Sequence, residues 1–119
     1  MWNLPNMPKG EHMPDLSQDK IHALLHHIQQ AAQGCGALAI VVVDASGLEL
    51  ATCRQGGTTR AYEDMALMRA QMATDQTPPP NGSALLYAGG SLVGAVGVST
   101  EAGQRDHELA MSRPQSYIL

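Results

Sequence analysis

The sequence of 119 residues contains no phenylalanine, 3% aromatic residues and only 15% charged residues. Without large rings, the core has to be built from Ala, Val, Leu, Ile and Met side chains. The charged fraction is below the usual quarter of a globular chain, which is either a chance bias or a sign that another subunit covers part of the surface. No apolar run approaches the roughly 18 residues that span a bilayer, so no membrane span is expected.

The charge balance and the cysteines narrow the functional classes. Seven Lys and Arg stand against 11 Asp and Glu, a net charge of −4. So few cations disfavour binding to nucleic acid or to an anionic membrane surface. Cys35 and Cys53 have no metal-type spacing, and we expect both to be reduced. The first residues lack a basic stretch followed by an apolar run, so we expect no signal peptide and a cytoplasmic location.

The first part of the chain predicts an arm and then a helix. Three prolines within residues 1–14 favour an extended N-terminal arm, and residues 15–119 are expected to form one domain. Apolar residues recur at helical spacing from Ile21 to Cys35, after Asp15 or Ser17 as the N-cap. Gly34 and Gly36 are expected to end this helix.

The next part of the chain predicts a hairpin and a second helix. The continuous apolar run 37–43 reads as a central strand, the turn 44–47 contains Asp and Gly, and 48–54 reads as the returning strand. A second helix is expected over about 60–74. It carries an apolar stripe that consists of Ala61, Met65, Met68 and Met72. Such a stripe is typical of a core or subunit contact.

Two apolar runs within residues 83–99 meet at Gly89 and Gly90, which predicts a tight type I′ hairpin. Gly94 and Gly97 lie inside the second strand, where glycine indicates a bulge or a close approach by another backbone or a flat ligand. A short last helix is expected within residues 100–112. Two hairpins with helices between them predict an α+β domain with an antiparallel sheet.

Two groups of side chains are candidates for binding. His22 and His26 lie four residues apart beside the apolar stripe of the first helix, a spacing that can share a metal or offer an axial ligand to haem iron. The alternative is that both are half-exposed polar residues. A second candidate set, able to serve acid–base chemistry or to bind a small ligand, consists of Asp44, Ser99, Asp106 and His107.

Three short motifs together resemble the family of GlcG-like and HbpS-like proteins, which includes the C-terminal domain of PduO-type cobalamin adenosyltransferases. They are Val41-Val42-Val43-Asp44-Ala45-Ser46-Gly47, Gly94-Ala95-Val96-Gly97-Val98-Ser99 and the segment from Gln104-Arg105-Asp106 to Ala110. The resemblance covers roughly residues 20–112. It implies a profilin-like α+β sandwich, assembly as a homo-oligomer, and haem as the ligand of characterised members.

The chain departs from this family pattern in three places. A lysine expected in the second helix is replaced by the run Met68-Arg69-Ala70-Gln71, the segment 73–82 is shorter and ends in three prolines, and Thr100 stands where a glycine is expected. If the missing segment helps to form a pocket, the ligand differs from that of the family.

The leading hypothesis is a small cytosolic haem- or tetrapyrrole-binding oligomer. His26 or His22 would be the axial ligand, His107 is a weaker candidate, and Gly94 and Gly97 would admit the flat ring. The alternative is an enzyme or accessory subunit that acts on a small organic acid or aromatic compound at the second candidate set. A third hypothesis is a purely structural subunit that associates through the methionine stripe and the arm.

Overall fold

The computed structural model describes residues 16–101 and 103–112, so the predicted arm, residues 1–14, lies outside the described residues. In chain order the elements are α1 Gln18–Ala31, β1 Leu38–Asp44, β2 Glu49–Gln55, α2 Arg60–Asp75, β3 Ser83–Ala88, β4 Ser91–Thr100 and α3 Asp106–Met111. The predicted α+β class is confirmed. None of the described helices is both long and apolar enough to cross a membrane.

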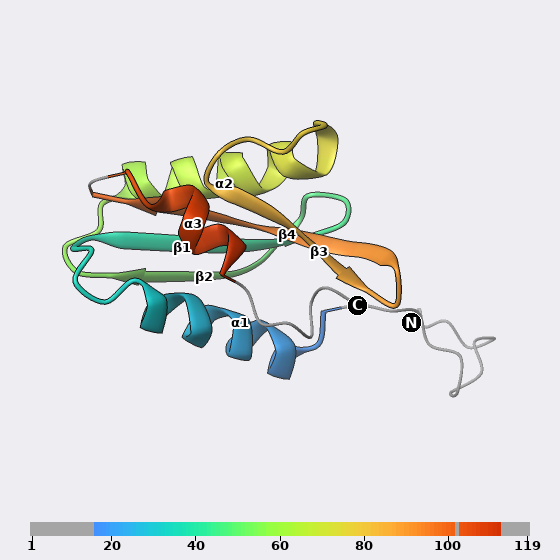
Figure 1. The fold of residues 1–119 in the computed structure, drawn as a ribbon, viewed down its shortest axis with the longest axis horizontal. Coiled ribbons are helices and arrows are strands. Elements are labelled where there is room, and N and C mark those ends of the chain that lie inside the picture. The colour runs from blue at the N-terminus through green and yellow to red at the C-terminus, as the bar shows by residue number, and fades with distance from the viewer. Residues whose placement is uncertain (1–15, 102, 113–119) are drawn as a thin grey trace.

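The four strands form one antiparallel sheet in the order β2-β1-β4-β3. The two hairpins therefore lie side by side, with β1 and β4 in the centre and β2 and β3 at the edges (Figure 1). The register of the central pair places Leu38 opposite Thr100 at one end and Asp44 opposite Gly94 at the other. Gly89 and Gly90 join β3 to β4 with φ of 58° and 81°, as a type I′ turn requires.

Helices α1 and α3 cover one face of this sheet (Figure 1). The N-cap of α1 is Ser17, whose hydroxyl accepts a hydrogen bond from the Lys20 N–H at 3.3 Å. The helix buries Ile21, Leu24 and Ile28. Leu24 and Ile28 pack with aliphatic residues of three strands and of α3, so this face has a core of branched side chains.

Helix α2 covers the opposite face through alanines, namely Ala66, Ala70 and Ala73. Because these side chains are small, the helix backbone approaches the sheet closely. The methionine stripe does not form this contact, since Met65 and Met68 are 39% and 45% exposed. The core interpretation of this stripe therefore fails for those two residues, and a contact between subunits stays a prediction.

Candidate functional site

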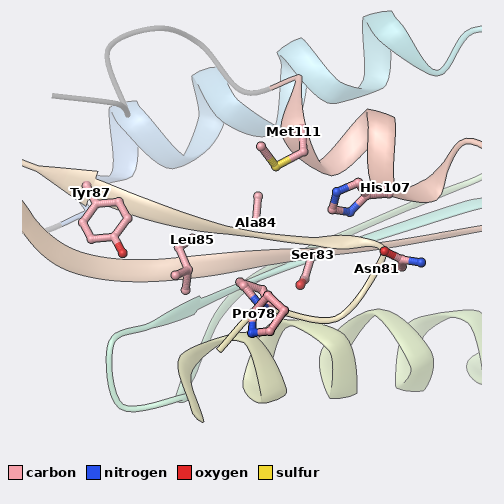
Figure 2. A pocket seen from close by; sticks show the side chains of 9 residues that line it. Pro78, Asn81, Ser83, Ala84, Leu85, Tyr87, His107 and Met111 are labelled. Carbon is pink, nitrogen blue, oxygen red and sulfur yellow. The ribbon is translucent and has the colours of Figure 1, made fainter. Parts of the chain in front are cut away.

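A groove runs along the outer side of the edge strand β3, between α3 and the proline loop that follows α2 (Figure 2). Its volume is about 440 Å³. Because the side chains of Ala84 and Leu85 belong to the cores on opposite faces of the sheet, the groove straddles the strand. Its lining is mostly apolar and consists of Pro78, Pro79, Asn81, Ser83, Ala84, Leu85, Tyr87, His107 and Met111.

Helix α3 forms one wall of the groove with His107 and Met111, which lie four residues apart on one side of the helix (Figure 2). The Nδ1 atom of His107 accepts a hydrogen bond from the Gly82 backbone N–H at 3.3 Å. A neutral imidazole that accepts at Nδ1 carries its proton on Nε2. His107 is therefore set up as a donor through Nε2.

Asp106 anchors this short helix to the sheet. Its carboxylate is only 4% exposed. Oδ1 accepts hydrogen bonds from the Thr100 backbone N–H at 3.1 Å and from the Thr100 hydroxyl at 2.6 Å. Thr100, which stands where the family pattern has glycine, thus supplies a hydroxyl that holds the start of α3.

The other carboxylate oxygen, Oδ2 of Asp106, pairs with the Arg69 guanidinium of α2 at 2.7 Å. The same Arg69 nitrogen donates to the Val98 carbonyl at 2.6 Å. The Val98 N–H donates to the Gly82 carbonyl, so the carbonyl of Val98 faces the same side, where β3 has not yet begun. Arg69 therefore satisfies a backbone acceptor and a buried carboxylate at once, and it joins α2, β4 and α3.

Gly82 is required by this cluster. A Cβ atom on it would lie 2.7 Å from the Arg69 guanidinium, and its φ of +84° already favours glycine. The sequence drew attention to Arg69 only as a departure from a family pattern. Its partner could not be identified from the sequence, because Arg69 and Asp106 are 37 positions apart and meet only through the sheet.

The second candidate set does not form one site. Asp106 and His107 lie together at the groove end of α3. Asp44 lies at the opposite end of β1, six residues or about 20 Å along the strand from the level of Thr100. Ser99 is 5% exposed and pairs with Ala39 of the core on the α2 face, away from α3.

Asp44 has a local role in its turn. Its Oδ1 accepts from the Ser46 hydroxyl at 2.7 Å, the Ser46 N–H at 2.9 Å and the Leu48 N–H at 3.0 Å. Burial raises the pKa of this carboxyl, but these hydrogen bonds outweigh it and leave the pKa below its ordinary value. A carboxylate held in its charged form in this way is suited to stabilising a turn.

The strand glycines make room for the chain itself. A Cβ atom on Gly97 would lie 2.0 Å from the Ala66 carbonyl oxygen of α2. A Cβ atom on Gly94 would lie 2.2 Å from the Val43 carbonyl oxygen and 2.8 Å from the Leu16 side chain. Close approach by other parts of the chain is observed at both glycines, and the pairing of β3 with β4 is also irregular between Leu86 and Tyr87, beside Gly94. Neither glycine lines the groove.

The helix histidines His22 and His26 are exposed on α1, and neither lines the groove. Within the part of the chain that the structure describes, no cluster of three or more His, Cys, Asp or Glu side chains could hold a metal ion. Cys35 and Cys53 are both free thiols. Burial raises the pKa of the Cys53 thiol, although a hydrogen bond from Gln29 opposes this.

No protein-family model and no curated protein matches the chain. Solved structures do match. A PduOC:haem complex has a TM-score of 0.73 and 20% identity, with 83% of this chain and 92% of that chain covered. A double mutant of Streptomyces reticuli HbpS has a TM-score of 0.73 and 20% identity, with 95% of this chain and 93% of that chain covered. Klebsiella pneumoniae protein ORFY has a TM-score of 0.72 and 19% identity, with 89% of this chain and 92% of that chain covered. The chain therefore has the fold of these proteins.

Proposed function

We propose that this chain is a binding protein for haem or another tetrapyrrole, which it holds in the groove along β3. The observation that carries the proposal is a largely apolar groove of about 440 Å³ with His107 and Met111 on one wall. This volume is within the range of roughly 300–1,000 Å³ that is typical of small-molecule sites. The shared fold of PduOC, which was crystallised with haem, supports the choice of ligand.

The residues of the groove fit a flat apolar ring with one iron ligand. Histidine and methionine are both side chains that hold haem iron in proteins. With its proton on Nε2, His107 cannot donate a lone pair from that atom, whereas the thioether of Met111 needs no deprotonation. Met111 is therefore the better iron ligand of the two, and bound haem would supply a redox-active iron there.

A binding role is better supported than a catalytic one. Of the four residues in the second candidate set, Asp106 is fully engaged by Arg69 and Thr100, and Asp44 is engaged in its own turn. Asp106 is therefore not free to act as a general base, and Asp44 does not line the groove. The helix pair His22 and His26 would need a second surface to enclose a ring, such as another copy of the chain, so homo-oligomerisation is part of the prediction for that site.

An absorbance titration with hemin tests the proposal. We expect a saturable Soret shift that is weakened at least about tenfold by Met111→Ala. Met68→Ala is the matched control. Met68 is 45% exposed and Met111 is 48% exposed, but Met68 lies on α2 and does not line the groove. Thermal unfolding of each variant confirms that the fold is retained.

A variant of the two helix histidines tests the alternative that the iron ligand lies on α1. A His22→Ala/His26→Ala double variant should keep the Soret shift if the groove is the site. If the shift is lost in the double variant and kept in Met111→Ala, the iron ligand lies on α1 and the groove proposal is wrong. If the wild-type protein shows no saturable shift, the chain does not bind haem.

A further inference from the structure

The groove has two chemically different ends (Figure 2). His107 and Asn81 lie at one end, beside the start of β3, and Tyr87 lies at the other. Between them the lining is apolar and includes Leu85 and Met111. A ligand that matches this groove has an apolar body and at least one polar group.

The polar end offers hydrogen-bond donors. The Gly82 N–H fixes His107 as an Nε2–H donor, and the side-chain amide of Asn81 carries two more N–H groups. The hydroxyl of Ser83 donates to the Pro80 carbonyl at 2.6 Å, so its own proton is already committed. The donors available to a ligand at this end therefore come from His107 and Asn81.

The electrostatics of this end favour an acceptor that carries negative charge. Two carboxylates flank His107 in the sequence: Asp106 is buried and paired with Arg69 at 2.7 Å, and Glu108 is exposed and paired with Arg105 at 2.7 Å. Within the described residues, no acidic side chain lines the groove. A ligand carboxylate would thus meet donors without meeting an opposing charge, and charge-assisted hydrogen bonds of this kind are the stronger ones.

We infer that His107 is a specificity-determining residue that recognises a carboxylate of the ligand through Nε2–H, with Asn81 beside it, while the apolar ring lies toward Leu85 and Tyr87. This inference rests on the proposed groove and gives the bound ligand a direction. The carboxylate belongs either to a tetrapyrrole side chain or to a free aromatic acid, since the chemistry of recognition is the same.

The first test uses metal-free protoporphyrin IX and its dimethyl ester, so that iron ligation does not contribute. The wild-type protein should bind the free acid at least about tenfold more tightly than the ester. His107→Leu should abolish this preference, whereas His107→Gln, which retains an N–H donor, should keep part of it. His27→Leu, on the exposed surface of α1, is the matched control and should keep all of it. Equal binding of acid and ester by the wild-type protein would overturn the inference.

The second test separates this inference from the tetrapyrrole proposal. Nitrogen NMR of histidine-labelled protein should report the Nε2–H tautomer for His107 and a shift of that nitrogen when 2-naphthoate is added, but not when its methyl ester is added. If neither porphyrin binds and naphthoate produces the shift, the ligand is a free aromatic acid and the carboxylate role of His107 stands. An Nδ1–H tautomer, or no response to either acid, would show that His107 is not the recognition residue.

Discussion

The two faces of the sheet are packed in opposite ways. On the α2 face, three alanines and the absent side chain of Gly97 let a helix backbone approach the strands so closely that a single methyl group on Gly97 would collide with the Ala66 carbonyl oxygen. On the face of α1 and α3, branched side chains such as Leu24 and Ile28 fill the space instead. Contact between backbones holds one face, and interlocking side chains hold the other.

This difference accounts for the position of the groove in which we propose that a ligand binds. Under α2, the helix backbone packs directly on the sheet, because the residues in contact are glycine and alanine. Space exists where this layer ends, along β3, with α3 on one side and the proline loop on the other (Figure 2). The position of the groove is therefore a consequence of how the two faces are packed.

The replacement Gly97→Ala should have the largest effect, because it adds one methyl group to the closely packed face. The new Cβ would lie 2.0 Å from the Ala66 oxygen and 2.8 Å from the Ala70 nitrogen, both of which are backbone atoms that cannot rotate away. We expect a loss of about 3 kcal/mol in the free energy of unfolding, at the upper end of what an added methyl group costs. Urea denaturation measures it, and a loss below about 1 kcal/mol would show that α2 moves freely on the sheet.

The replacement Asp106→Asn weakens the link between α2 and α3. Asparagine can still accept the Thr100 hydrogen bonds through its carbonyl oxygen but leaves Arg69, which is 23% exposed, without its opposite charge. We expect a loss of about 2–3 kcal/mol. Glu108→Gln, which breaks the exposed pair with Arg105, is the control and should cost much less, because solvent screens an exposed ion pair. Equal effects of the two variants would contradict the structural role given to Asp106.

The replacement Ile28→Val removes one methyl group from the face that is packed by side chains. Ile28 is fully buried, so a small cavity should form, but neighbouring side chains can partly fill it. We expect a loss of about 1 kcal/mol in the same denaturation experiment. The comparison of the two faces would fail if this deletion cost more than the addition at Gly97.

The sequence predicted the elements well but did not indicate the groove, for physical reasons. Helices and strands are local, so the stripe of α1, the apolar run of β1 and the turn glycines Gly89 and Gly90 predicted them directly. The groove depends on which strand lies at the edge of the sheet and on the pairing of Arg69 with Asp106, and neither is a local property. Gly97 shows the same limit, because glycine in a strand predicts a close approach without identifying what approaches.

The smallest expected effect lies at the rim of the α2 face, in the turn between β1 and β2. There the Gln71 amide donates to the Gly47 carbonyl at 3.1 Å, and Asp44 holds the turn through its side chain. Because the pKa of Asp44 is lower in the folded state, the unfolded chain binds the proton first as the pH falls. The charged carboxylate therefore contributes stability above about pH 3.8, its ordinary pKa, and this contribution is lost as the pH falls through the folded pKa.

Asp44→Asn should cost less than about 1 kcal/mol at pH 7 and nothing in the acid range, so unfolding curves of the two proteins should converge below pH 3.8. A difference that stays constant from pH 7 to pH 3 would show that the charge of Asp44 does not stabilise the turn.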